Sequence, residues 1–310
     1  MRIVMYGKPL GVGGYLTELP FLLDGRIERI YKDAADLQDL ECDIAIANFT
    51  RDPLNSGGNE NGWNYLRLPK VKVQLAIQAE HFSEYIPEWS DGITHNFNGS
   101  VCYNFNKPFW DFDDSIHDCF AKSYWEENNF KIKPRFYFDP MVKWNDFYKG
   151  PLSNFKDYGH MIGSSTVHRN RIKETNPYKY RYMNGDMRDL TIQHELKKSG
   201  IGWNIHKFQL RGLCPETDEK EVKNVAKSEE IKLAYLYNLG MAVVTEKLDH
   251  TFPERLKDSI IEVDDIDKYQ IHPGDLKEQA LHTQTVFDEY HNLNTEIDDL
   301  INNITKEFGI

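Results

Sequence analysis

The sequence lacks several features that mark specialised classes of protein. It has four cysteines in 310 residues, and they are scattered without the spacing of a metal site. It contains no apolar run of the roughly 18 residues that a membrane-spanning helix needs. The first residues enter a strand pattern directly, without the layout of a signal peptide. We therefore expect a cytoplasmic protein with reduced thiols, no contact with a membrane and no resident metal.

Basic residues are also in short supply. The chain has 37 Lys and Arg against 49 Asp and Glu, which gives a net charge of −12 and a pI of about 5.4. This balance argues against non-specific binding of nucleic acid, which uses a basic surface, although it leaves room for a local basic patch. Hydrophobic residues make up 40% of the chain, enough for one large core or two ordinary ones.

The first half of the sequence predicts a Rossmann-like domain. A short apolar run at residues 2–6 leads into the glycine-rich stretch 7–14, and residues 15–23 have apolar positions at helical spacing. Gly11, Gly13 and Gly14 would allow a ligand to approach the backbone; a plain tight turn is the alternative. Their spacing differs from the dinucleotide fingerprint, which disfavours a dehydrogenase. Further strands are expected at 26–31, 42–48 and 71–78.

The second half repeats this pattern after an aromatic-rich segment and a linker at 150–154. Strands are expected at 158–162, 201–206, 241–245 and 259–263, and helices at 189–199, 228–239 and 275–304. The prediction is an α/β protein with two Rossmann-like domains, 1–150 and 151–274. A C-terminal helical segment, 275–310, is expected to pack back on the first domain.

A candidate phosphate site lies between residues 161 and 171. Gly163, Ser164 and Ser165 form a turn whose backbone N–H groups could point at an anion. Arg169 and Arg171 follow, and a guanidinium can bind a phosphate through two bonds. We therefore interpret the stretch as a cradle for a diphosphate, with a solvated basic loop as the alternative. His168 is interpreted as a bystander.

Two further places have candidate functional residues. Lys232 lies in the first turn of an expected helix, where it could reach a phosphate, and Glu229 or Glu230 could accept hydrogen bonds from ribose hydroxyls. An ordinary amphipathic helix is the alternative.

Glu80 lies just past the end of a buried strand, at the edge where ligands bind in open α/β sheets. It could act as a general base, or it could be a surface acid.

The order and spacing of these pieces resemble the T-even-phage DNA base glycosyltransferases, above all the β-glucosyltransferase type. Residues 72–80 are similar to the strand that ends in that family's catalytic aspartate, whose place Glu80 would take. The 136–140 stretch looks like the segment that crosses between its domains. Gly163, Ser164, Arg169 and Arg171 match the loop that binds the UDP diphosphate.

Further segments extend the resemblance over nearly the whole chain. The strand at 43–48 with the loop at 55–58 is similar to the family's strand and glycine loop, and 241–265 to its last pair of strands. The distance from Lys232 to Gly240 follows a spacing common in GT-B glycosyltransferases. The usual glutamate between them falls on Tyr235, which leaves the ribose contact to Glu229 or Glu230. The long glycine-rich first loop departs from the phage enzyme.

The resemblance implies a GT-B fold, with two Rossmann-like domains facing a cleft and a C-terminal helix crossing back. It implies an inverting transfer from a UDP-sugar, UDP-glucose or UDP-arabinose, to 5-hydroxymethylcytosine in double-stranded phage DNA. The protein would act as a monomer in the host cytoplasm, and Mg²⁺ could assist release of UDP. Two alternatives remain: transfer to a surface polysaccharide or another small acceptor, and a non-catalytic GT-B-like binding module.

Overall fold

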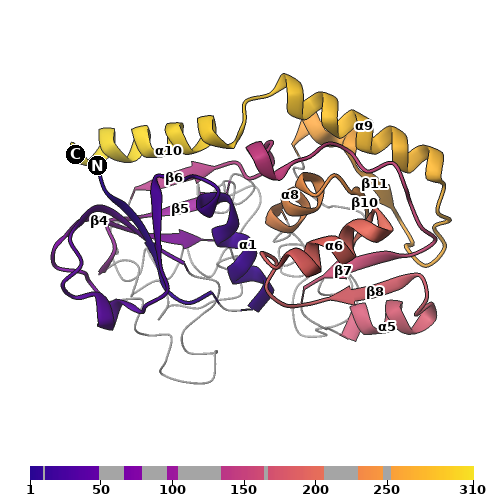
Figure 1. Cartoon of the computed structure of the whole chain (residues 1–310), viewed down its shortest axis with the longest axis horizontal. Helices are drawn as coiled ribbons and strands as arrows, with labels where there is room; N and C mark the ends of the chain where they lie inside the picture. The colour runs from indigo at the N-terminus through magenta and orange to yellow at the C-terminus, as the bar shows by residue number, and fades with distance from the viewer. Residues whose placement is uncertain are drawn as a thin grey trace, which may run out of the picture. The chain divides into compact units, whose positions relative to one another are not determined.

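The chain forms two compact units in a computed structural model. The structure describes residues 1–9, 11–48, 66–78, 96–103, 134–163, 167–205, 230–246 and 253–310; at 11–13, 78, 167 and 230 it describes the backbone alone. Unit 1 comprises Met1–Asp139 and Asn294–Ile310, and unit 2 comprises Pro140–Leu293 (Figure 1). The expected boundary at residue 150 therefore lies inside unit 2.

Unit 1 contains a six-stranded sheet in which every described pairing is parallel. Its strands are β1 (Ile3–Tyr6), β2 (Ile27–Ile30), β3 (Cys42–Ala47), β4 (Val71–Gln78), β5 (Gly99–Tyr103) and β6 (Arg135–Phe138). They are arranged in the order β2-β1-β3-β4-β5-β6. The described helices of this unit are α1 (Gly11–Leu22), the short 3-10 helix η1 (Ala34–Leu37) and α10 (Leu293–Phe308).

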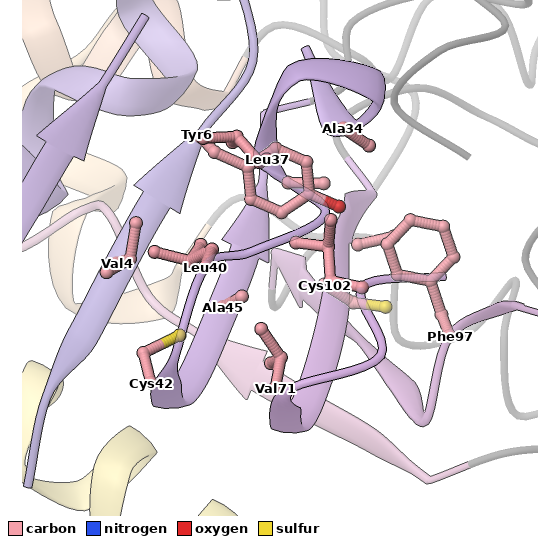
Figure 2. Packing of buried hydrophobic residues seen from close by; sticks show 13 residues of the cluster. Val4, Tyr6, Ala34, Leu37, Leu40, Cys42, Ala45, Val71, Phe97 and Cys102 are labelled. Carbon is pink, nitrogen blue, oxygen red and sulfur yellow. The ribbon is translucent and has the colours of Figure 1, made fainter. Parts of the chain in front are cut away.

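The core of unit 1 lies on the faces of this sheet. All four residues of β1 are buried, as expected for a parallel strand that is covered on both sides. Figure 2 shows one cluster, in which Tyr6 of β1 lies with Leu37 of η1, Val71 of β4 and Cys102 of β5. Continuous apolar runs in the sequence therefore form the central strands.

Helix α10 packs on unit 1 through one apolar face. Ile297, Leu300 and Ile304 are buried and recur at helical spacing. Asp298, exposed beside this face, forms an ion pair of 2.5 Å with Arg26. The backbone N–H of Asp139 donates to Glu296. The end of the chain thus completes the same unit as its beginning.

Unit 2 contains a five-stranded sheet, also parallel in every described pairing. Its strands are β7 (Gly159–Ile162), β8 (Tyr180–Met183), β9 (Ile201–Asn204), β10 (Ala242–Glu246) and β11 (Ile261–Val263), in the order β11-β10-β9-β7-β8. Its helices are α5 (Val167–Thr175), α6 (Leu190–Ser199), α8 (Glu230–Asn238) and α9 (Pro273–Glu289), with 3-10 turns η5 (Asn145–Phe147) and η6 (Glu254–Ser259).

The two sheets have the same strand order. Numbered within each unit, the first five strands of both run 2-1-3-4-5, which is the order of doubly wound, flavodoxin-like sheets. The direction of winding reverses between the first and third strands, β1 and β3 in unit 1 and β7 and β9 in unit 2. The prediction of two Rossmann-like α/β sheets is therefore confirmed.

Local signals placed several elements correctly. Strand β4 has the predicted bounds. Helix α6 begins at the predicted place because the side chain of Asp189 accepts a hydrogen bond of 2.7 Å from the backbone of Thr191. It ends at Gly200, whose φ of 73° is in the left-handed region that glycine favours.

Other predictions need correction. Helix α1 begins at Gly11, inside the stretch expected to be a loop. The expected single helix at 275–304 is two helices, of which α9 belongs to unit 2. The break is stabilised by unit 2 itself, because the backbone N–H of Leu293 donates to the carbonyl of Lys143 over 2.9 Å. Strands β5, β6 and β8 and helix α5 were missed. In the described part of the chain, no helix is long and apolar enough to cross a membrane.

Candidate anion-binding site

Polar and charged side chains gather at the switch point of unit 2. Ligands of open α/β sheets bind outside the carboxyl ends of the strands, where the winding reverses. Gly163 follows β7 at this edge, Asn204 is the last residue of β9, and Glu246 is the last residue of β10. The candidate site is built from these strand ends and from the first turns of α5 and α8.

Arg169 is a buried cation at this edge. It lies in helix α5, which corrects the expectation that both arginines lie in a loop. Its side chain is 4% exposed, and its Nε donates to the carbonyl of Ile205, directly after β9, over 2.8 Å. This bond connects the helix to the strand on the other side of the switch point.

Gly163 makes the position of Arg169 sterically feasible. A Cβ added at Gly163 would lie 2.8 Å from Nη1 of Arg169, closer than real side chains come. The φ of Gly163 is 124°, a conformation that other residues rarely adopt. The glycine predicted to cradle a ligand therefore also accommodates the guanidinium.

Arg171 has a different environment from Arg169. It is exposed, and its Nη2 lies 3.4 Å from Nδ1 of His168. Residues two apart on a helix point in different directions. The two arginines predicted to act together are therefore separated, and Arg169 is the buried member.

Lys232 is the second buried cation. It lies in the first turn of α8 and is 5% exposed. Burial holds the pKa of Lys232 well below its usual range, and the charge of Arg169 lowers that pKa further, whereas Glu246 raises it. The positive charge of Arg169 therefore disfavours the protonated form of Lys232.

A histidine–glutamate pair lies beside these cations. Nε2 of His168 lies 2.7 Å from Oε1 of Glu246, and the two side chains are 3% and 17% exposed. The sequence interpretation treated His168 as a bystander and did not select Glu246. The criterion that selected Glu80, an acid at the carboxyl end of a buried strand, applies equally to Glu246 and could have found it.

Asn204 adds an unsatisfied acceptor at the same edge. The residue is fully buried, and its Nδ2 donates to Oγ1 of Thr245 over 2.8 Å. Its Oδ1 is buried and accepts no hydrogen bond from the residues that the structure describes. A buried acceptor without a donor is costly, so the site has hydrogen-bonding capacity left for another group.

Several predicted site residues cannot be placed in this cluster. Glu80, Ser164, Ser165 and Glu229 lie outside the described residues, and only the backbone of Glu230 is described.

The predicted glycines of unit 1 lie in helix α1. Gly11 and Gly13 belong to its first turn, and a Cβ on Gly14 would lie 3.0 Å from the backbone of Pro9. Gly14, inside the helix, therefore allows the preceding backbone at Pro9 to approach closely. The structure does not test the ligand role predicted for these glycines.

Unit 1 has its own polar cluster at the equivalent switch point. Arg29 and Glu18 form a buried ion pair of 2.6 Å, with side chains 7% and 0% exposed. Nδ2 of Asn48, directly after β3, donates to Glu18 over 3.0 Å and to the carbonyl of Gly14 over 3.2 Å. Here one cation is balanced by one carboxylate.

The described part of the chain contains no candidate metal centre. Among those residues, no group of three or more His, Cys, Asp and Glu side chains is arranged to hold a metal ion. Among the described residues, the polar side chains at the candidate site are those of His168, Arg169, Asn204, Lys232 and Glu246.

Comparisons with known proteins do not assign the chain to a family. No protein-family model and no curated protein matches it. Among solved structures it is similar to one described as a two-component system response regulator/GGDEF domain protein, with 8% sequence identity, 93% of this chain and 100% of that chain covered, and a TM-score of 0.20. A similarity this low carries no argument about fold or function.

Proposed function

We propose that unit 2 binds the diphosphate of a nucleotide-linked sugar and that the protein is a UDP-sugar-dependent glycosyltransferase. The observation that carries the proposal is the burial of two basic side chains, Arg169 and Lys232, at the switch point. Burying two like charges costs several kcal/mol, roughly, unless an opposite charge compensates them. Glu246 lies at the same edge, and a bound anion would add negative charge there.

The local architecture favours a phosphate as that anion. Helix α5 begins at Val167, four residues after Gly163, and the N-terminus of a helix has unsatisfied N–H groups and a partial positive charge. Arg169 offers a planar pair of donors, and Lys232 a compact ammonium. Together they suit the oxygens of a diphosphate better than a single carboxylate.

The sequence resemblance supplies the finer terms of the proposal. By that resemblance the nucleotide is UDP, the sugar is glucose or arabinose, and the acceptor is 5-hydroxymethylcytosine in DNA. Glu80 would accept the proton of the acceptor hydroxyl, which attacks the anomeric carbon with inversion as the bond to the diphosphate breaks. Arg169 and Lys232 would stabilise the leaving diphosphate, and such charge stabilisation is usually the largest catalytic contribution. Arg171, being exposed, would act at the rim.

A binding experiment tests the first part of the proposal. Calorimetry with UDP, UDP-glucose, uridine and pyrophosphate should show binding that requires the diphosphate, so that uridine alone binds at least about tenfold more weakly. Lys232→Met should weaken binding of every phosphate-bearing ligand. An exposed lysine, Lys268, provides the matched control as Lys268→Met. Equal affinity for uridine and UDP would contradict a diphosphate site.

A transfer experiment tests the second part. The protein is incubated with radiolabelled UDP-glucose or UDP-arabinose and with duplex DNA that contains either 5-hydroxymethylcytosine or cytosine. Incorporation that requires the hydroxymethyl group supports the proposed acceptor. Glu80→Gln should abolish incorporation and leave binding of UDP intact. Unchanged turnover by this variant would show that another group is the base.

One observation favours a second acceptor class. The net charge of −12 disfavours DNA as a partner, and transfer to a polysaccharide or another small acceptor does not require a basic surface. Measuring retention of duplex DNA at low and moderate salt separates the two classes. Binding of UDP without binding of DNA supports the second class.

A further inference from the structure

Asn204 offers a hydrogen-bond acceptor for which the proposed diphosphate has no donor. It is the last residue of β9, at the carboxyl edge of the sheet in unit 2, and its side chain is fully buried. No described residue donates to its Oδ1. Native proteins rarely leave a buried acceptor unpaired, because burial removes the water that would otherwise donate to it. The acceptor can therefore gain a hydrogen bond when a ligand brings a donor.

Neighbouring hydrogen bonds fix the orientation of the Asn204 amide. Its Nδ2 lies 2.8 Å from Oγ1 of Thr245, and this Oγ1 lies 2.8 Å from the carbonyl of Glu246 and 3.3 Å from that of Asn204. Carbonyls only accept, so the single hydroxyl proton of Thr245 goes to one of them, and the hydroxyl oxygen accepts from Nδ2. Turning the amide over would place Oδ1 against an oxygen whose proton is already used. Oδ1 is therefore the atom that a ligand can satisfy.

The side chain of Asn204 lies on the face of the sheet that helix α8 covers. Side chains alternate between the two faces along a strand, so Asn204 shares a face with Gly202. A Cβ added to Gly202 would lie 2.7 Å from Cδ1 of Leu236 in α8. Helix α8 ends at Asn238, shortly before the parallel neighbour of β9 begins. The first turn of α8, with Lys232, therefore lies toward the opposite edge, where β9 ends.

A diphosphate by itself does not provide what Oδ1 requires. The oxygens of an ionised diphosphate diester only accept hydrogen bonds, and so does a side-chain amide oxygen. In a nucleotide-linked sugar, each phosphate is esterified to a sugar. The donors nearest to the diphosphate are therefore sugar hydroxyls. The chemistry of the acceptor thus suits a diphosphate that carries hydroxyl groups close to the phosphates.

We propose that Oδ1 of Asn204 accepts a hydrogen bond from a sugar hydroxyl of the ligand and makes unit 2 selective for sugar-bearing diphosphates. The proposal rests on the diphosphate site proposed above, of which Asn204 is the uncharged part that recognises a hydroxyl. Thr245 is a positioning residue, because it holds the amide in the orientation that presents Oδ1. A site of this kind rejects an analogue that lacks the hydroxyl, since the buried acceptor is then left unpaired.

Ligand analogues test the proposal in wild-type protein. Calorimetry compares UDP-glucose with a series of analogues, each of which lacks one hydroxyl of the ribose or of the glucose. One analogue should bind at least about tenfold more weakly than UDP-glucose, because its binding leaves Oδ1 unpaired. Equal affinity across the whole series would overturn the proposal.

A variant of Asn204 connects this loss to the residue. Asn204→Leu removes the acceptor and keeps the approximate shape of the side chain. It should weaken binding of UDP-glucose at least about tenfold and have no further effect on the analogue that lacks the recognised hydroxyl. Dimethyl diphosphate, which has a methyl group in place of each sugar, carries no donor, and its affinity should change less than about twofold. Additive losses for the variant and the analogue would overturn the proposal.

Two further variants serve as controls. Thr245→Val removes the oxygen that accepts from Nδ2 and keeps the shape, so it should weaken UDP-glucose binding less than Asn204→Leu and leave dimethyl diphosphate unaffected. Asn48→Leu removes the asparagine that directly follows β3 in unit 1, and affinity for UDP-glucose should change less than about twofold. A loss with Asn48→Leu equal to that with Asn204→Leu would show a general effect of removing a buried asparagine and would overturn the proposal.

The outcomes also separate this proposal from the one on which it rests. If wild-type protein binds neither dimethyl diphosphate nor UDP-glucose, the diphosphate site and this inference both fail. If both ligands bind and Asn204→Leu weakens both alike, only the recognition of a hydroxyl fails. Circular dichroism and thermal unfolding show whether each variant is folded. If Asn204→Leu does not fold, the analogue series in wild-type protein decides.

Discussion

The two units share a strand order, but the charged side chains buried at their switch points differ. In unit 1, Arg29 and Glu18 pair directly, and Asn48 bonds to the same carboxylate. In unit 2, Arg169 and Lys232 are both buried, and one carboxylate, Glu246, acts on the two of them. The first cluster contains a direct ion pair, whereas the second brings two basic side chains to one edge of the sheet.

This difference shows that topology places a site without deciding its chemistry. Equivalent strand ends meet at both switch points, and an asparagine follows or ends the third strand in each, as Asn48 and Asn204. In both residues, Oδ1 is buried and has no hydrogen-bond partner among the described residues. Function therefore depends on the side chains added to a common frame. We expect the balanced cluster to hold unit 1 together and the cationic cluster to bind a ligand.

The largest expected effect comes from breaking the balanced pair. Arg29→Met leaves Glu18 buried without its cation, and such a change costs about 3–5 kcal/mol. Urea denaturation should show a loss of this size. Arg2→Met is the matched control, since Arg2 pairs with Glu28 and both side chains are 48% exposed, so its effect should be under about 1 kcal/mol. Equal losses of stability in the two variants would show that the buried pair contributes no more to stability than the exposed pair.

A backbone change at the cationic site should have the next largest effect. Gly163→Ala introduces a Cβ 2.8 Å from Nη1 of Arg169 at a positive φ, which should cost about 1–3 kcal/mol and weaken binding of pyrophosphate. Gly25→Ala is the control, because a Cβ there has no heavy atom within 4 Å. A tolerated Gly163→Ala would indicate that Arg169 adjusts freely.

Removing a buried basic side chain from unit 2 should change the free energy of unfolding in the direction opposite to Arg29→Met. Lys232→Met replaces a buried ammonium by an apolar chain of similar length, which should stabilise the ligand-free protein by about 1 kcal/mol and weaken pyrophosphate binding at least about tenfold. Thermal unfolding and calorimetry measure the two effects. If Lys232→Met instead lowers stability as much as Arg29→Met does, the buried charges of the two units do not differ in their effect on stability.

The smallest effect is a dependence on pH. The folded pKa of Lys232 is lowered, so between that value and the ordinary one of about 10.4 the unfolded chain binds more protons. Stability from this residue therefore rises with pH across that window. The advantage of Lys232→Met over wild type should therefore shrink as the pH rises towards about 10 in thermal unfolding. A constant difference would show that Lys232 keeps its charge throughout.

Elements with strong local signals could be predicted from the sequence. Strand β4 is a continuous apolar run, and α6 has an N-cap at Asp189 and a C-terminal glycine at Gly200. Each signal lies within a few residues of the element that it specifies. Predicted helix bounds were wrong where residues distant in sequence form hydrogen bonds. The helix expected at 275–304 is interrupted at Leu293, whose backbone N–H donates to the carbonyl of Lys143.

Helix α5 shows why part of the site could not be predicted. Its buried positions include His168, Arg169 and Ile172, which lie on one face at helical spacing. Two of these three side chains are polar, so hydrophobic periodicity does not reveal the helix. Arg169 was selected as a phosphate ligand, but its burial and its bond to Ile205 depend on a strand that is distant in sequence.

The sequence by itself indicated two α/β halves, several of their strands and the position of the cationic stretch after β7, because strand runs, caps and glycine turns are local; it did not reveal strands β5, β6 and β8. Only the tertiary structure decided which polar groups are buried together. It separated Arg169 from Arg171 and brought Lys232 and Glu246 to the same edge. The physical reason is that burying a charge depends on partners supplied by other elements, and those partners meet only when the sheet has formed.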